Sequence, residues 1–238
     1  MAISRDLSAS LRHRFGSQLL QEHPRIVIAA TNPEMIQSAI GMARQEQFRI
    51  LPLGTGSSFP ADYSRLNENT LAILLGALEG ECGGDAFSSW YWAGTRLTRL
   101  AADFPGFFPD DGARATLGGF IADSSFSSSD ANFHRIQTLL LSMEVLTATG
   151  DFELFAGEGT GTVYTLASSH LFFGSRGHLG IMVRVRLRRV LGRKGGVVQS
   201  SGASGTSFVT SESPPVLTRS HLQSLLDPGG LFAWKKDL

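Results

Sequence analysis

Three short segments rich in glycine and hydroxyl side chains contain the residues that are best suited to bind a ligand. The first, residues 54–58, reads Gly-Thr-Gly-Ser-Ser and directly follows an apolar stretch. Its backbone N–H groups can converge on an anion, and its hydroxyls add further donors. It lacks the lysine of a nucleoside-triphosphate P-loop and the third glycine of the dinucleotide fingerprint, and Phe59-Pro60 opposes immediate entry into a long helix. The loop suits a pyrophosphate held without positive charge, although such a loop alone is more often a plain turn.

The other two segments lie further along the chain. Thr116-Leu117-Gly118-Gly119 falls within residues 105–130, which show no clear period, and an irregular stretch of this length is unusual inside a compact domain unless it is functional. Gly174, Gly177 and Gly180 are spaced by three just before an apolar strand. Glycines let the backbone approach a flat ligand closely. Taken separately, Thr116-Leu117-Gly118-Gly119 also fits a plain surface loop. The glycines at 174, 177 and 180 also fit a tight connection into the following strand.

Length and charge narrow the class of protein. The chain has 238 residues, 42% of them hydrophobic, with a formal net charge of +0, which fits one large domain or two small lobes around one ligand. Nothing in this charge steers the protein to nucleic acid or to an anionic membrane. Arg184, Arg186 and Arg188 alternate with apolar residues, which predicts the solvent face of a strand.

Cysteine and histidine usage argues against metal and disulfide chemistry. The single cysteine, Cys82, builds neither a disulfide framework nor a cysteine metal site, and indicates a free thiol in a reducing compartment. The six histidines are scattered with no i, i+4 pair, so we expect no metal site. His178 is the one histidine inside a glycine motif, where it is a candidate general base or a passive loop residue. Residues 1–15 do not resemble a signal peptide and no membrane span is expected, so we expect a cytoplasmic protein.

Periodicity and turn signals predict an α+β chain. Its first 75 residues read as β-α-β-loop-β, and a helix is expected to begin at Pro33 with Asn32 as its cap. Residues 149–151 predict a hairpin turn. The expected helices are residues 7–20, 33–47, 97–104 and 163–168, and the expected strands are residues 25–30, 49–53, 71–75, 88–93, 139–147, 152–156 and 181–190.

The order of the motifs along the chain is more specific than any one of them. They are Leu51-Pro52-Leu53-Gly54-Thr55-Gly56-Ser57-Ser58, Phe108-Pro109-Asp110, Ala115-Thr116-Leu117-Gly118-Gly119-Phe120-Ile121-Ala122 and Phe173-Gly174-Ser175-Arg176-Gly177-His178-Leu179-Gly180-Ile181. In this order they resemble the FAD-binding domain of the p-cresol methylhydroxylase/vanillyl-alcohol oxidase family, in particular glycolate oxidase flavin subunits and D-lactate dehydrogenases. The tail Leu226-Asp227-Pro228-Gly229-Gly230-Leu231-Phe232 is similar to the C-terminal segment of that group.

The resemblance implies a fold and a cofactor. The fold would be a two-lobed FAD-binding domain over residues 1–191, with lobes at about residues 24–78 and 85–191 and FAD between them. Leu53, Gly54, Thr55, Gly56, Ser57 and Ser58 would wrap the pyrophosphate; Pro109, Asp110, Thr116, Gly119, Asp123 and Ser124 would line the flavin and ribityl chain; Gly177, Gly180 and Ile181 would add backbone contacts. The pyrophosphate loop holds no histidine, so the FAD is expected to be non-covalent.

The resemblance also implies what this chain lacks. Relatives insert a substrate domain before the C-terminal segment, whereas here a Ser/Gly-rich linker, residues 192–220, fills that place. Residues 221–238 would dock back on the FAD domain as a tail. Because the family's catalytic base comes largely from the substrate domain, we assign no catalytic acid or base.

Three functions remain open at this point. The first is an FAD-dependent oxidoreductase or subunit that oxidises a 2-hydroxy acid with the help of a partner subunit. The second is a non-catalytic FAD-binding or interaction subunit whose uncovered apolar face drives homo-oligomerisation. The third follows the UDP-N-acetylenolpyruvylglucosamine reductases, which share the flavin fold but also need a third domain.

Overall fold

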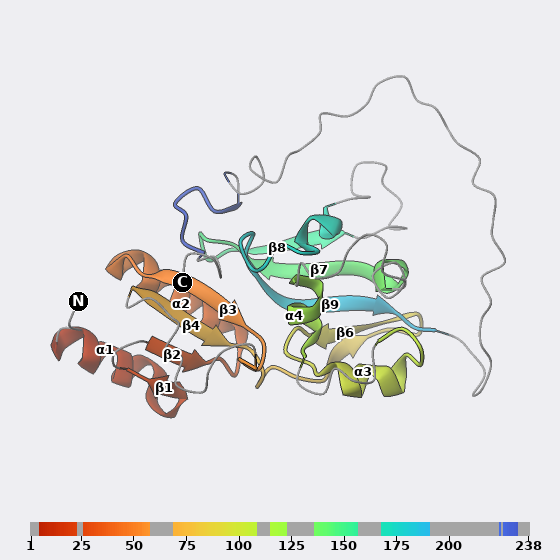
Figure 1. The fold of residues 1–238 in the computed structure, drawn as a ribbon, viewed down its shortest axis with the longest axis horizontal. Coiled ribbons are helices and arrows are strands. Elements are labelled where there is room, and N and C mark those ends of the chain that lie inside the picture. The colour runs from red at the N-terminus through yellow and green to blue at the C-terminus, as the bar shows by residue number, and fades with distance from the viewer. Residues whose placement is uncertain are drawn as a thin grey trace, which may run out of the picture.

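Two lobes lie side by side in the computed structural model of the chain (Figure 1). The structure describes residues 5–22, 26–57, 69–108, 115–122, 136–156, 168–190, 224 and 226–232. The first lobe carries a four-stranded sheet in the order β1-β2-β4-β3, and the second a five-stranded sheet in the order β5-β6-β9-β7-β8. Helices accompany both sheets, so the predicted α+β class is confirmed.

The first lobe is built around parallel strands. β2 and β3 both pair in parallel with β4, and β1 adds an antiparallel edge. α2 begins where the Asn32 side chain accepts a hydrogen bond from the Met35 N–H at 2.8 Å, with Pro33 in the first helical position, as predicted. The elements are α1 Arg5–Phe15, a 3-10 turn Gly16–Gln18, β1 Leu19–Gln21, β2 Ile26–Ala29, α2 Pro33–Glu46, β3 Arg49–Leu53 and β4 Thr70–Leu74.

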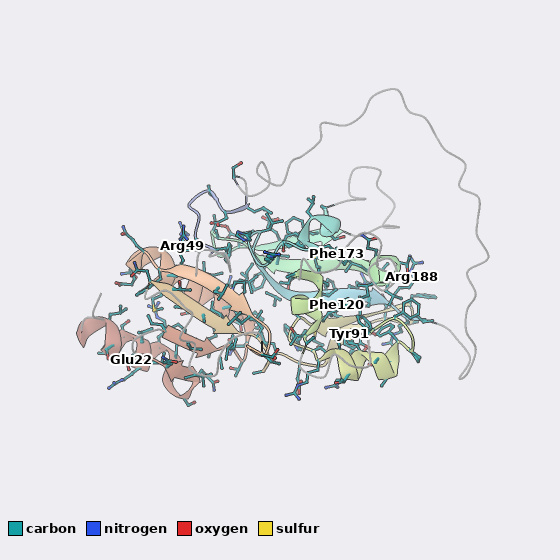
Figure 2. The ribbon with its side chains drawn as sticks, viewed as in Figure 1. Glu22, Arg49, Tyr91, Phe120, Phe173 and Arg188 are labelled. Atoms are coloured by element: carbon teal, nitrogen blue, oxygen red, sulfur yellow. The ribbon has the colours of Figure 1, made fainter. Side chains whose placement is uncertain are left out.

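The second lobe packs two short helices on an antiparallel sheet. Side chains of α3 and α4, among them Leu100 and Phe120, share one buried cluster with Tyr91, Met143 and Val185 of the strands. Figure 2 labels Tyr91 and Phe120 inside this lobe. The elements are β5 Glu81–Gly84, β6 Ser88–Trp92, α3 Leu97–Asp103, α4 Leu117–Ala122, β7 Leu140–Leu146, β8 Phe152–Ala156, a 3-10 turn Ser169–Phe172 and β9 Ile181–Arg188.

The alternation along β9 follows the sequence prediction. Val183, Val185 and Leu187 are fully buried, while the arginines between them are partly exposed. Arg184 forms an ion pair with Glu144 in which its Nε lies 2.8 Å from the Glu144 carboxylate, and its guanidinium stacks on Trp90. Arg186 likewise pairs with Asp85, with its Nη2 2.6 Å from the carboxylate, so both arginines are paired with carboxylates on the partly exposed face of β9.

One hydrophobic cluster spans the two lobes. Leu146 and Ile181 of the second lobe belong to the same buried cluster as Ile36 and Ile40 of α2. The Gln37 side-chain amide also donates to the Gly150 carbonyl, in the turn between β7 and β8, at 2.9 Å. Because this cluster joins the lobes, packing contributes to their relative placement.

The backbone crossing at Gly94 is the tightest contact of this junction. A Cβ atom at Gly94, which follows β6, would lie 1.9 Å from the Leu75 carbonyl oxygen and 2.5 Å from that of Leu78, both of which follow β4. The two chain segments can cross at this distance only because no side chain stands between them.

Most predicted elements are present, and the differences are local. The predicted helix 7–20 is wrong in its second half, because α1 ends at Phe15 and residues 19–21 form strand β1. Strand β5, which is half glycine, the 3-10 turn Ser169–Phe172, and α4, which lies inside a stretch expected to be irregular, were also not predicted. The hairpin at residues 149–151 is confirmed. The expected helix at residues 163–168 lies outside the described residues apart from Ser168.

Replacing Gly94 with alanine is expected to destabilise the protein strongly. The added methyl group would meet backbone carbonyls, which cannot move aside as a flexible side chain can, so we expect a loss of about 3 kcal/mol or more in the free energy of unfolding. Gly41→Ala is the matched control, because nothing lies within 4 Å of its Cβ position inside α2. Alanine there is expected to add about 1 kcal/mol. Urea unfolding followed by tryptophan fluorescence measures both; equal stabilities of the two variants would contradict the crossing.

Candidate cofactor site

The first glycine loop begins where β3 ends and is held there by β4. The Leu75 N–H donates to the Leu53 carbonyl at 2.9 Å, and the Gly76 N–H donates to the Gly54 carbonyl at 3.1 Å. These bonds extend the parallel β3–β4 pairing by one step and fix the start of the loop. Gly54, Thr55 and Gly56 are half-buried and Ser57 is exposed.

The second segment touches the first at Gly54. A Cβ atom at Gly54 would lie 2.2 Å from Thr116 Oγ1, so this contact requires glycine. Thr116 is 2% exposed, and its Oγ1 accepts a hydrogen bond from the Gly119 N–H at 3.2 Å, which caps the first turn of α4. The Gly118 N–H donates to the Ala93 carbonyl at 2.8 Å, which anchors α4 to the end of β6.

The third segment meets both of the others. Gly177 takes a left-handed φ of +83°, and a Cβ atom there would lie 2.7 Å from Cγ of Pro52, near the end of β3. The Gly174 N–H donates to the Ile121 carbonyl at 2.9 Å, and the Arg176 N–H donates to the Ala122 carbonyl at 2.8 Å. The segment is thereby tied to the end of α4, so the three glycine segments meet at one place in the fold.

The remaining predicted residues of the third segment lie inside the protein. Gly180 is buried, with its Cβ position 2.6 Å from Cγ1 of Val145. Ile181 is fully buried in the core shared by the lobes. Its side chain therefore packs within the protein. The predicted residues Ser58, Pro109, Asp110, Asp123 and Ser124 lie outside the described residues.

The donors of the site are neutral with one exception. In the described parts of the three segments, residues 54–57, 116–119 and 174–180, Arg176 carries the one permanent charge, on a backbone with φ of +55°. The other groups are backbone amides, hydroxyls and the imidazole of His178. The amides of Gly118, Gly119, Gly174 and Arg176 already donate within the protein, so the loop of residues 54–57 is the part of this set that suits an anion bound through backbone hydrogen bonds.

One buried hydroxyl beside the site has no hydrogen-bond partner among the described residues. Ser175 is 2% exposed, and within the described part of the chain its Oγ makes no hydrogen bond. An unpaired buried hydroxyl costs on the order of 1–3 kcal/mol. Its backbone is nevertheless well held, because the Ser175 N–H donates to the Phe172 carbonyl at 3.1 Å. The backbone of the third segment is therefore held in place at Ser175, while the Ser175 hydroxyl contributes no hydrogen bond within the described residues.

Two groups with shifted pKa values lie on β5 and β6, strands of the second sheet that carry none of the three segments. Burial, followed by the neighbouring Asp103 carboxylate, raises the pKa of Tyr91 to about 12. Burial also raises the pKa of the Cys82 thiol, against the lowering effect of Arg184. A neutral thiol is a poor nucleophile, so the shift argues against a reactive cysteine.

Metal ligation and membrane insertion find no support in the described structure. Among the residues it covers, no three His, Cys, Asp or Glu side chains gather as a metal site. None of the helices within those residues is long and apolar enough to cross a bilayer.

Comparison with known proteins decides the family. A family model described as "FAD binding domain" matches residues 24–154, which is more than half of the chain. The chain belongs to this family. The predicted FAD-binding domain of the p-cresol methylhydroxylase type is confirmed, and FAD is its cofactor.

Two curated relatives show how far the similarity extends. An "Alkyldihydroxyacetonephosphate synthase" of Dictyostelium discoideum is 24% identical over 217 residues, which cover 77% of this chain and 33% of the relative. A "Probable D-lactate dehydrogenase, mitochondrial" of Danio rerio is 27% identical over 174 residues, covering 69% of this chain and 35% of the relative. The chain thus spans about a third of the length of these relatives.

Solved structures agree with the fold. An alkyldihydroxyacetonephosphate synthase, solved in the crystal forms P212121 and P1, superposes with a TM-score of 0.53 at 22% identity over 77% of this chain and 34% of that one. The residues present also fit the cofactor, because Gly54, Thr55 and Gly56 are only half-buried and carry small or hydroxyl side chains, which suits a close approach of the loop backbone to a diphosphate.

Sequence reasoning missed three residues that support the site. Gly76 holds the carbonyl of Gly54, Pro52 packs on Gly177, and Gly94 permits the crossing of the lobes. The signal for Gly76 was available, since it directly follows the predicted strand 71–75 and a glycine at a strand often marks a close backbone approach. Pro52 lies within a quoted motif, yet its partner is 125 positions away in the chain, which no local pattern reveals.

Gly54→Ala is expected to weaken FAD binding at least about tenfold, which corresponds to 1.4 kcal/mol. The added methyl group displaces either the loop or the Thr116 side chain, which lies 2.2 Å away. Adding Thr116→Ala is expected to restore part of the affinity, because the nearest remaining atom is Cβ of Thr116 at 3.2 Å. Titration of flavin fluorescence measures the dissociation constants, with Gly41→Ala as control. Unchanged affinity of the Gly54→Ala variant would show that the contact does not shape the site.

Proposed function

We propose that this chain holds FAD non-covalently between its lobes and serves as the flavin domain of an oxidoreductase that acts on a 2-hydroxy acid. The observation that carries the proposal is the meeting of the three glycine segments through the Gly54–Thr116 and Gly177–Pro52 contacts. Backbone amides and hydroxyls at one place suit the diphosphate of a dinucleotide, and family membership names the dinucleotide as FAD.

The proposed roles of the residues follow the order of the chain. Leu53 and residues 54–58 bind the pyrophosphate, since the β3–β4 hydrogen bonds hold the start of this loop in place. Thr116 and Gly119, together with Pro109, Asp110, Asp123 and Ser124, line the ribityl chain and the flavin. Gly177, Gly180 and Ile181 are proposed for backbone contacts alone, and all three are buried in this structure. The pyrophosphate loop holds no histidine that could form a covalent link.

The proposed reaction is the oxidation of a 2-hydroxy acid. FAD, when bound, supplies the hydride acceptor. This chain orients the cofactor through the three segments, and the D-lactate dehydrogenase among its relatives supports a 2-hydroxy acid as substrate. His178, half-buried in the third segment, stays a candidate general base or a passive loop residue, and we assign no catalytic base to this chain.

We propose that the reaction also needs a second chain. Residues 192–220 stand where the family carries its substrate domain, and residues 221–238 form a tail that docks on the FAD domain. A partner subunit or another copy of this chain would then cover the substrate side of the flavin. The single cysteine of the chain is compatible with a reducing cytoplasm, which we propose as the location of the protein.

A non-catalytic FAD-binding or interaction subunit is the second candidate. The edge strand β8 presents exposed apolar side chains, with Leu154 66% and Phe152 41% exposed, which favours association with another protein surface. The two relatives are also named for different activities, a synthase and a dehydrogenase, so membership of the family does not by itself fix the reaction.

Reduction of the bound flavin separates the two candidates. The purified chain, incubated with FAD and passed through a sizing column, is expected to carry the flavin absorption bands. Anaerobic addition of D-lactate or glycolate is expected to bleach those bands if the chain is an oxidoreductase. A bound flavin that neither acid reduces, alone or with a partner subunit, favours the interaction subunit. A chain that takes up no FAD would refute both.

A further inference from the structure

The short segment of residues 226–232 touches both lobes. The Leu226 carbonyl accepts a hydrogen bond at 3.3 Å from the N–H of Ala148, which follows β7 of the second lobe. At the other end of the segment, the Leu231 carbonyl accepts a bond at 2.7 Å from the N–H of Ile50, in β3 of the first lobe. In Figure 1 this blue segment lies beside β3 and the ends of β7 and β8.

Burial divides the segment in the same way. Leu226 packs against the core of the second lobe, whereas Leu231 and Phe232 pack into the cluster that contains α2 and β3. Phe232 is 3% exposed and forms a parallel bridge with Ile50 at the free edge of β3. The segment is therefore anchored at both ends by apolar contacts, with an exposed turn at Pro228 and Gly229 between them.

Asp227 holds the two ends of the segment together. Its side chain is buried, with the residue 3% exposed, and its carboxylate oxygens accept from the Leu231 N–H at 2.7 Å and the Phe232 N–H at 3.0 Å. Bonds from backbone N–H groups to a carboxylate are among the stronger hydrogen bonds in proteins. They close the turn that brings Leu226 and Phe232 to opposite lobes.

We infer that residues 226–232 form a strap that sets the relative position of the two lobes, and that Asp227 is the positioning residue that closes it. The inference rests on the proposed function in one respect, since it takes FAD to bind between the lobes. Gly54 belongs to the first lobe and Thr116 to the second, so the contact that shapes the site is itself a contact between lobes. Opening the strap should loosen that contact without removing any residue from it.

The test compares Asp227→Ala and Asp227→Asn with a matched control at Asp85. Asp85 also accepts two backbone hydrogen bonds, from Phe87 and Ser88, both at 2.8 Å, but it closes a turn within the second lobe alone. Asp227→Ala removes both hydrogen bonds from the N–H groups of Leu231 and Phe232, and Asp227→Asn keeps one acceptor oxygen. The FAD dissociation constant is expected to rise at least about tenfold for alanine and less for asparagine. Asp85→Ala is expected to leave the FAD dissociation constant within about twofold of the wild-type value. All dissociation constants are measured well below the melting temperatures of the variants.

Hydrogen exchange of individual amides measures whether the strap stays docked on both lobes in the absence of the cofactor. The amides of Ile50 and Ala148 are expected to lose protection together in Asp227→Ala and to keep it in Asp85→Ala, since these two N–H groups donate to the strap. If Asp227→Ala melts at a lower temperature yet binds FAD like the wild type, Asp227 has a structural role only and the inference is overturned. If the wild-type chain takes up no FAD, the proposed function fails, and the exchange of Ile50 and Ala148 still decides on the strap: retained protection in Asp227→Ala overturns it.

Discussion

The contact between the backbone of Gly54 and the side chain of Thr116 is the constraint on which the site depends. A methyl group at Gly54 would lie 2.2 Å from the threonine hydroxyl, well inside any tolerated contact distance. Gly54 is positioned at this contact by the parallel pairing of β3 with β4. Thr116 is positioned there as the residue that caps α4. Each lobe therefore contributes one half of the contact, and the site exists only when the lobes are packed together.

The helix α4 is the element that gathers the other parts. It has six residues, too few to be stable on helical propensity alone, and it is held by bonds at both ends. Its N-terminal half is anchored to the Ala93 and Thr95 carbonyls of the second lobe, and its C-terminal carbonyls receive the N–H groups of Gly174 and Arg176. Gly177 in turn packs on Pro52 of the first lobe. The three segments are therefore connected to one another by a closed series of contacts.

Local signals were sufficient for most of the fold. The Asn32-Pro33 cap and the alternating arginines of β9 gave correct predictions because each depends on near neighbours in the chain. The order of the glycine motifs predicted the family and its cofactor, although each motif alone is weak. Strand β5 and helix α4 escaped prediction because glycine lowers both propensities, and tertiary hydrogen bonds supply what propensity lacks. The same holds for Asp227, whose carboxylate serves a turn that only the packing of both lobes explains.

The central claim is that the three glycine segments bind one cofactor together. Hydrogen exchange measured by mass spectrometry, with and without FAD, tests it most directly. The account predicts that peptides spanning residues 54–57, 117–119 and 176–180 all gain protection at the same FAD concentration, because they meet at one place. Protection confined to a single one of these segments, or found only on the outer face of the second sheet, would contradict the account.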